Sequence, residues 1–328
     1  MGQAFLPVFF CLLKKEDRQE CLFRSTALNC WLVHPMKRRK KFRLKLASGM
    51  LVLGERTLVM GVLNVTPDSF SDGGKYDQPE SAIAHALAME RAGADMIDVG
   101  GESTRPGSGE IHASEELDRI LPVLEGLRGR LKIPVSVDTR RSAVAELAIR
   151  AGAQIINDVS GLKNDARIAE VAAKYGVPLV LMHMRGEPGT MQRGPFARDV
   201  VRDVMQGLRD SVQKARKAGV AKSQIILDPG IGFGKSYAQN YELLQKLTQL
   251  AALGYPLVAG TSRKGFLGAT LARDGKPAPP EDRKWGTAAT VTASILGGAH
   301  IVRVHDVAEM VQVARVADCV VNAKLRKR

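Results

Sequence analysis

The chain has 328 residues, of which 45% are hydrophobic and 25% are charged. This balance is typical of a globular protein and excludes a collagen-like or largely disordered chain. The formal net charge is +14, but residues 1–50 contribute +8 and residues 324–328 contribute +4, which leaves +2 on the rest. Because a nucleic-acid groove would place basic charge on the folded body, we expect solvated basic tails and no nucleic-acid partner.

Residues 1–50 differ from the rest of the chain in their basic charge, and we expect a poorly ordered or disordered N-terminal extension. The apolar run at residues 4–13 is too short to span a bilayer, and no basic stretch precedes it as in a secretory signal. We therefore expect no membrane association. One hypothesis is that residues 1–35 are a misassigned extension and that Met36 is the true start, which N-terminal mass spectrometry of the native protein would test.

The cysteines indicate the cellular compartment. They are Cys11, Cys21, Cys30 and Cys319. Their spacing includes no C-x2-C pair and no Cys/His pattern typical of a zinc site. A single cysteine beyond residue 30 cannot form a disulfide framework and is typical of a reducing compartment, so we expect a cytoplasmic protein.

Between residues 57 and 320, short apolar runs alternate with amphipathic stretches. The predicted strands are 58–65, 96–100, 134–138, 154–158, 178–183, 224–230, 256–262 and 300–306. Predicted helices include 80–94, 141–153, 198–219, 285–299 and 307–321, and the longest loop is expected at 265–284. Apolar strands alternating with helices indicate a parallel sheet covered on both faces. Eight such units predict an α/β fold with a single (β/α)8 TIM barrel, followed by a basic tail at 321–328.

Polar side chains stand at the carboxyl ends of the predicted strands, which form the active-site face of such a barrel. Carboxylate and amide groups there are Asp98, Asp138, Asn157 and Asp228. Cationic groups are Arg105, Arg263, Lys264, Arg303 and His305. We expect two poles, in which carboxylates bind a nitrogen-rich heterocycle and cations bind a phosphate. Without a Ser-His-Asp or Cys-His set, the chemistry is expected to rely on positioning and leaving-group stabilisation.

Three features allow more than one interpretation. Asp98 could brace a loop or contact a ligand. His183 could be a hydrogen-bonded core histidine or a site residue. The Gly-rich run at 230–236 resembles a phosphate-binding P-loop, but the first glycine of that motif would fall on Pro229, which argues against it.

Two segments carry a family resemblance. Residues 60–74, MGVLNVTPDSFSDGG, and residues 98–107, DVGGESTRPG, resemble the signature segments of dihydropteroate synthases, the pterin-binding enzymes of folate biosynthesis. Matching segments follow in order at 136–139, 156–158, 228–235, 262–264 and 303–307. The resemblance spans roughly residues 57–320, which makes it more specific than any single motif. Residues 1–35 have no counterpart in the family pattern.

The resemblance implies a transferase that joins p-aminobenzoate to 6-hydroxymethyl-7,8-dihydropterin diphosphate, with Mg²⁺, and releases pyrophosphate and 7,8-dihydropteroate. It assigns catalytic roles to Asp98, Arg105, Asp138 and Lys264. The implied pterin contacts are Asp138, Asn157, Asp228 and Lys264, with Met182 and Gly260 in the substrate-binding set. Asn64 would help to place Mg²⁺, and Arg303 and His305 would hold the diphosphate. Ser103, Thr104 and Arg105 would belong to a loop that closes over the substrates, and Phe233, Pro106 and the segment Ser262, Arg263 and Lys264 would border the aminobenzoate pocket.

The resemblance also suggests a homodimer that forms through the last helices, and a sulfonamide target. Gly265 stands where the family commonly has serine, so a hydroxyl contact to the aminobenzoate carboxylate is lost. Two alternatives have small-molecule ligands as well: a catalytically silent pterin-binding paralogue, and a protein similar to methyl-folate corrinoid methyltransferases. A third is nucleic-acid binding through the basic tails, which would be sensitive to salt.

Overall fold

The computed structural model describes residues 39–66, 78–102, 111–186 and 189–323. Its main sheet consists of β3 (Leu58–Asn64), β4 (Met96–Gly100), β5 (Val135–Asp138), β6 (Ile155–Asp158), β7 (Leu179–Met182), β8 (Ile225–Asp228), β9 (Val258–Ala259) and β10 (Ile301–Val304). The strands are parallel, in the order β8-β7-β6-β5-β4-β3-β10-β9. A parallel bridge between Leu227 and Leu257 joins the two ends of this sheet. The predicted (β/α)8 barrel is confirmed.

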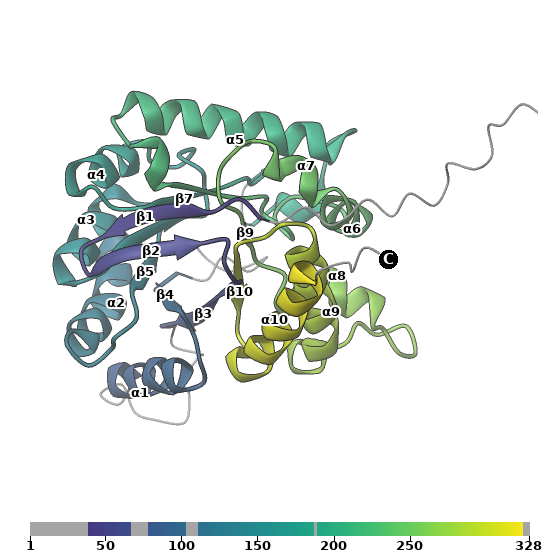
Figure 1. The fold of residues 1–328 in the computed structure, drawn as a ribbon, viewed down its shortest axis with the longest axis horizontal. Coiled ribbons are helices and arrows are strands. Elements are labelled where there is room, and N and C mark those ends of the chain that lie inside the picture. Colours follow the sequence, from purple (N-terminus) through teal and green to yellow (C-terminus); the bar gives the residue numbers. More distant parts are fainter. Residues whose placement is uncertain (1–38, 67–77, 103–110, 187–188, 324–328) are drawn as a thin grey trace, which may run out of the picture. The chain divides into compact units, whose positions relative to one another are not determined.

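Helices surround the barrel (Figure 1). They are α1 (Gln78–Arg91), α2 (Ala113–Leu127), α3 (Ser142–Ala151), α4 (Ile168–Tyr175), α5 (Val200–Lys217), α6 (Tyr237–Gln245), α7 (Leu247–Ala251), α8 (Gly265–Thr270), α9 (Lys284–Leu296) and α10 (Val307–Asn322). The expected loop at 265–284 is only partly irregular, because Phe266 and Leu267 bury their side chains and form α8. Nowhere in the described ranges is a helix both long and apolar enough to cross a membrane.

Side chains alternate along each strand between the helices and the barrel interior. On β4, Ile97 and Val99 pack in the core between the sheet and the helices, whereas Met96 lies in a second cluster inside the barrel. Asp98 has the same inward parity as Met96. The inner apolar cluster contains Leu58, Met60, Met96, Ile155, Val180, Ile226, Val258 and Ile301, all near the amino ends of their strands. Polar side chains are therefore left to the carboxyl end of the interior.

A hairpin covers the amino end of the barrel. Strands β1 (Phe42–Leu46) and β2 (Gly49–Leu53) pair in antiparallel fashion, and Leu44, Leu46 and Leu53 pack into the inner apolar cluster. The expectation of a poorly ordered extension through residue 50 is wrong for residues 39–50, because their alternating leucines fill the barrel end. Residues 1–38 and 324–328 lie outside the described residues.

Candidate active site

Arg303, on β10, is the centre of a hydrogen-bond network at the carboxyl end of the barrel interior. Its Nε donates to Asp98 Oδ2 at 2.6 Å, and its Nη2 donates to Asp138 Oδ2 at 2.7 Å. Asn157 Nδ2 donates to the same Asp98 oxygen at 2.9 Å. The barrel thus brings together side chains from β4, β5, β6 and β10 at the level where (β/α)8 enzymes bind their substrates.

This arrangement differs from the expected separation of carboxylates and cations into two poles. The guanidinium of Arg303 lies between two carboxylates instead of opposite them. The physical reason is burial, because Asp98 is fully buried and a buried carboxylate requires a cation or hydrogen-bond donors. The Asp98 carboxylate thus accepts hydrogen bonds from Arg303 and Asn157.

Burial perturbs the titratable groups of the site. It raises the pKa of the Asp138 carboxyl, and Arg303 opposes that rise. It also raises the pKa of Asp228. The pKa of the Lys264 ammonium is lowered to about 7 by burial and by Arg303, against the opposing effect of the carboxylates of Asp228 and Asp138. A group of perturbed acids and bases at this end of a barrel is typical of an active site.

One wall of the site is apolar. Met182 and Phe233 pack in one buried cluster with Val159, Met184 and Met191. Lys264 Nζ lies 3.8 Å from the centre of the Phe233 ring, which is a cation–π contact. Gly232 has a φ of +87°, and a Cβ there would lie 2.9 Å from Lys264 Cδ. A glycine at 232 therefore leaves room for Lys264 to extend over the ring.

The segment after β9 carries further predicted residues. Ser262 Oγ lies 2.9 Å from His305 Nδ1 and accepts the His305 backbone N–H at 3.2 Å. Burial lowers the pKa of His305 to about 3, with a smaller effect from Arg303 in the same direction, so the imidazole is neutral near pH 7. Arg263 forms a bidentate pair with Asp306, at 3.1 Å from Nε and 2.5 Å from Nη2.

Two glycines border this segment. A Cβ at Gly260 would lie 3.8 Å from Arg303 Cβ, which places Gly260 next to the central network. Gly265 is the first residue of α8, and a Cβ there would meet no atom within 4 Å. The serine that is common in the family would therefore fit at position 265 without a clash.

Asn64, the last residue of β3, is the predicted Mg²⁺ ligand. Its side chain is half-buried, and it lies opposite Gly100 in the register of β3 and β4. In the part of the chain that the structure describes, no group of three or more His, Cys, Asp or Glu side chains could hold a metal ion. The side-chain amide oxygen of Asn64 is a donor of the kind that Mg²⁺ prefers.

Ser103, Thr104, Arg105 and Pro106 lie outside the described residues. Glu102, which precedes them, is held by two guanidinium groups. Its carboxylate accepts from Arg140 Nη2 at 3.0 Å and from Arg141 Nη1 at 2.9 Å. The start of this predicted substrate loop is thus attached to the active-site end of β5.

Lys235 is a buried residue near the site to which the sequence assigned no role. It is buried behind the loop that follows β8, where its Nζ contacts His183 and the backbone oxygen of Gly230. His183 is accordingly a hydrogen-bonded core histidine. The available sequence signal was a lysine at the end of the Gly-rich segment 228–235, which matches the family pattern but to which no role was assigned.

Known proteins share this arrangement of strands and sequence. The family model for pterin binding enzymes matches residues 60–305. Dihydropteroate synthase from Synechocystis sp. is 48% identical over 265 residues, which cover 81% of this chain and 90% of the relative. The chain belongs to the dihydropteroate synthase family.

Solved structures agree with this family. Xanthomonas albilineans dihydropteroate synthase with 4-aminobenzoic acid is 41% identical, with a TM-score of 0.80 over 87% of this chain and 100% of that one. The Yersinia pestis dihydropteroate synthase with a sulfonamide drug complex is 42% identical, with a TM-score of 0.79 over 86% of this chain and 100% of that one. The resemblance inferred from the motifs is confirmed, and the chain is an enzyme, a transferase of folate biosynthesis.

Proposed function

We propose that the carboxyl end of this barrel catalyses the family's reaction, in which p-aminobenzoate displaces pyrophosphate from 6-hydroxymethyl-7,8-dihydropterin diphosphate and forms 7,8-dihydropteroate. The observation that carries this proposal is the buried network around Arg303, with Asp228 and Lys264 beside it. Buried carboxylates that are held in place by hydrogen bonds from a neighbouring side chain can accept hydrogen bonds from the N–H groups of a flat heterocycle. A small-molecule substrate follows from the enclosed position of these groups.

The pterin ring is bound by groups from four elements of the barrel. Asp138 and Asp228 accept its N–H donors, and Asn157 offers an amide between them. Lys264 donates to ring acceptors and lies over Phe233, so the ring meets both a polar edge and an apolar wall. Because Arg303 fixes Asp138 and Asp98 fixes Asn157, the polar edge is in place before the substrate arrives.

Breaking the bond from the pterin methylene to the diphosphate oxygen leaves positive charge on the pterin and adds negative charge to pyrophosphate. The carboxylates of Asp138 and Asp228 stabilise the cationic pterin. Arg303 and His305 are proposed to orient the diphosphate, His305 as a neutral hydrogen-bonding group. Bound at Asn64, Mg²⁺ would supply charge stabilisation for the leaving group. The aniline nitrogen of p-aminobenzoate then forms the new bond to the methylene and loses a proton.

The aminobenzoate pocket is proposed to lie between Phe233 and the segment from Ser262 to Lys264. The relatives bind 4-aminobenzoic acid in one structure and a sulfonamide in another, so we propose the same ligand class for this chain. Gly265 offers a backbone N–H but no hydroxyl group at this position.

Pyrophosphate release tests the proposed reaction. We expect release from the dihydropterin diphosphate to require both p-aminobenzoate and Mg²⁺, with 7,8-dihydropteroate formed in equal amount. Chelation should abolish release, and added Mg²⁺ should restore it, because the leaving group then regains its charge stabilisation. Pterin binding without product in this assay would instead support the silent paralogue, and release unaffected by chelation would reject the Mg²⁺ role.

We also propose a homodimer through α9 and α10. Val316 and Val320 lie one helical turn apart on α10 and are 67% and 51% exposed. Trp285 and Leu296 on the adjacent α9 are 77% and 37% exposed. Large apolar side chains exposed on two neighbouring helices favour burial against another protein surface, and a second copy of this chain is the partner we propose.

Charge introduced on α10 should separate the subunits. The double variant Val316→Glu/Val320→Glu is expected to sediment as a monomer, because two carboxylates from each subunit would be buried in the interface. Sedimentation velocity of the wild type and of Leu147→Glu, which adds a carboxylate to α3, provides the comparison; both should remain dimers. A monomeric wild type would end the homodimer proposal.

We propose a cytoplasmic location for the enzyme. Within the described part of the chain, Cys319 is a free, exposed cysteine. A free thiol at the surface supports a reducing compartment. Subcellular fractionation with an antibody against the barrel would test this location.

A further inference from the structure

Lys235 is nearly inaccessible to solvent, with 1% of its surface exposed. Its Nζ lies 2.8 Å from Gly230 O, 2.9 Å from His183 O and 3.0 Å from His183 Nδ1. The two backbone oxygens can only accept, so the role of Nδ1 decides the charge: an ammonium group donates to all three atoms, whereas a neutral amine would accept from a protonated Nδ1. Burial lowers the pKa of Lys235 to about 7, and the carboxylates of Asp228 and Asp203 oppose that change. His183 Nε2 lies 3.5 Å from the Asp203 carboxylate, which favours the ring proton on Nε2, an accepting Nδ1 and hence the charged form of Lys235.

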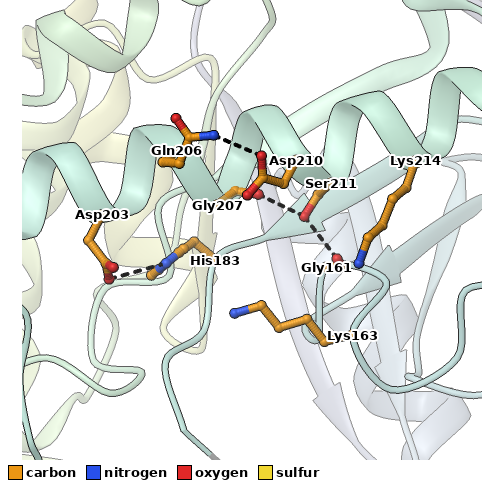
Figure 2. A pocket seen from close by; sticks show the side chains of 9 residues that line it. All are labelled: Gly161, Lys163, His183, Asp203, Gln206, Gly207, Asp210, Ser211 and Lys214. Carbon is orange, nitrogen blue, oxygen red and sulfur yellow. Dashed lines mark hydrogen bonds and ion pairs between the residues drawn. The ribbon is translucent and has the colours of Figure 1, made fainter.

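The contact with Lys235 defines the proton position on His183. Because the ammonium donates, Nδ1 must accept, and the ring proton is on Nε2. Nε2 lies 3.5 Å from Asp203 Oδ2 on α5, and Figure 2 shows the imidazole directed toward this carboxylate beside a cavity of about 230 Å³. Burial lowers the pKa of His183 to about 2, and Lys235 adds to the effect, so the imidazole is neutral. His183 thus connects α5 to Lys235.

The two residues that accept from Lys235 are also the two that hold Asp228. The Gly230 N–H donates to Asp228 Oδ1 at 2.7 Å, and the His183 N–H donates to the Asp228 backbone oxygen at 3.0 Å. Gly230 has a φ of +64°, and a Cβ there would lie 1.9 Å from His183 O, so only glycine allows this approach. One ammonium group therefore fixes both the backbone and the carboxylate of Asp228.

Lys235 also acts on Asp228 through its charge. Asp228 must be ionised to accept the N–H donors of a pterin. Burial raises the pKa of its carboxyl, whereas Lys264, Lys235 and Arg303 lower that pKa. Lys264 and Arg303 belong to the proposed substrate-binding set, and Lys235 does not. The cations near Lys235 itself are Lys163 and Lys264, which disfavour its charge.

We propose that Lys235 is a positioning residue for pterin binding. Its buried ammonium holds Asp228 in its binding geometry and, without contacting the substrate, keeps the Asp228 carboxylate ionised. The inference rests on the proposed role of Asp228 in the pterin site. It assigns the lysine at the end of the Gly-rich run a function that needs no contact with substrate.

Calorimetric titration with 6-hydroxymethylpterin, which lacks the diphosphate and cannot react, tests the proposal over a series of pH values. Lys235→Met should weaken binding roughly 10- to 100-fold, the effect of losing a charged hydrogen-bond donor. Affinity is lost as the pH falls through the pKa values of the two pterin-binding carboxylates, Asp138 and Asp228, and Lys235 acts on that of Asp228. Without Lys235 that pKa rises, so the loss of affinity should move to higher pH by about one unit.

A matched control separates positioning from general destabilisation. Arg39 is also a buried cation, with 3% of its side chain exposed, and it pairs with Asp318 on α10. Arg39→Met should lower the thermal midpoint and leave the affinity for 6-hydroxymethylpterin and its pH profile unchanged. The acid limb is the part of the pH profile in which affinity is lost as the pH falls. Lys235→Arg, which retains the charge, should bring this acid limb back toward that of the wild type. Lys235→Gln removes the charge but keeps N–H donors, and it provides the same pH test if Lys235→Met does not fold.

The outcomes distinguish two failures. A wild-type protein that does not bind 6-hydroxymethylpterin would contradict the proposed pterin site. A wild type that binds, together with a Lys235→Met or Lys235→Gln variant of unchanged affinity and unchanged acid limb, would overturn the positioning role. Weaker binding at every pH with no shift of the acid limb would reject the electrostatic part of the proposal.

Discussion

Asp228→Asn is expected to fold like the wild type and to bind the pterin roughly 100- to 1,000-fold more weakly. The amide oxygen of asparagine can still accept the Gly230 N–H that now reaches Asp228 Oδ1 at 2.7 Å. Its NH₂ group would then face the N–H donors of the substrate, so two donors would meet without an acceptor. Calorimetric titration with 6-hydroxymethylpterin, with urea unfolding in parallel, measures both effects. Folding stability should change little, because removal of a buried charge is offset by the loss of its attraction to Lys264 and Lys235.

A second strand-ending aspartate provides the control for Asp228→Asn. Asp158, at the end of β6, is fully buried, and its carboxylate accepts the backbone N–H groups of Ser160 at 2.8 Å and Leu162 at 2.6 Å. Asp158→Asn should reduce the free energy of unfolding by about 1–3 kcal/mol and leave pterin affinity unchanged. The two variants therefore have opposite signatures. Wild-type affinity in Asp228→Asn would contradict the proposed pterin contact.

Arg303→Met should cause the largest loss of folding stability. Its guanidinium is the cation that pairs with both Asp98 and Asp138. Removing one partner of a buried ion pair leaves an uncompensated charge and costs about 3–5 kcal/mol. Urea unfolding at neutral pH should show this decrease in the free energy of unfolding, together with loss of pyrophosphate release.

The pH dependence of Arg303→Met gives a second readout. Burial raises the pKa of Asp138 in the wild type against the opposing effect of Arg303, so the folded-state pKa should rise further in the variant. A folded state with the higher pKa binds more protons than the unfolded state, so stability increases as the pH falls. The deficit relative to the wild type should shrink on acidification. The double variant Arg303→Met/Asp138→Asn should recover part of the loss, and an unchanged urea midpoint in Arg303→Met would refute the pairing.

The barrel was predictable because its pattern is local. Strands such as β4 and β10 are predicted by short apolar runs, and helices such as α5 and α10 are predicted by the spacing of their apolar residues. The hairpin was missed although Leu44, Leu46 and Leu53 alternate within it. Basic residues between these leucines gave residues 39–50 the composition of a solvated tail. Only the open end of the barrel shows why those leucines are buried.

The candidate site was partly predictable for a related reason. Asp138, Asn157 and Asp228 end their strands, and parallel strands of a barrel bring their carboxyl ends to one face. The partners of these residues were not predictable. Arg303 is 205 residues from Asp98 in the chain, and the sequence suggested an anion-binding role for it apart from the carboxylates. Lys235 looks like a surface lysine until the loop after β8 is seen to enclose it.

The sequence by itself determined the family, the order of the barrel strands, and which polar groups end those strands. These properties depend on residue type and on spacing along the chain. The tertiary structure alone decided that Arg303 lies between Asp98 and Asp138, that Lys235 supports Asp228 from behind, and that the hairpin fills the barrel end. The reason is that pairing and burial depend on distances between segments far apart in sequence, and closure of the barrel sets those distances.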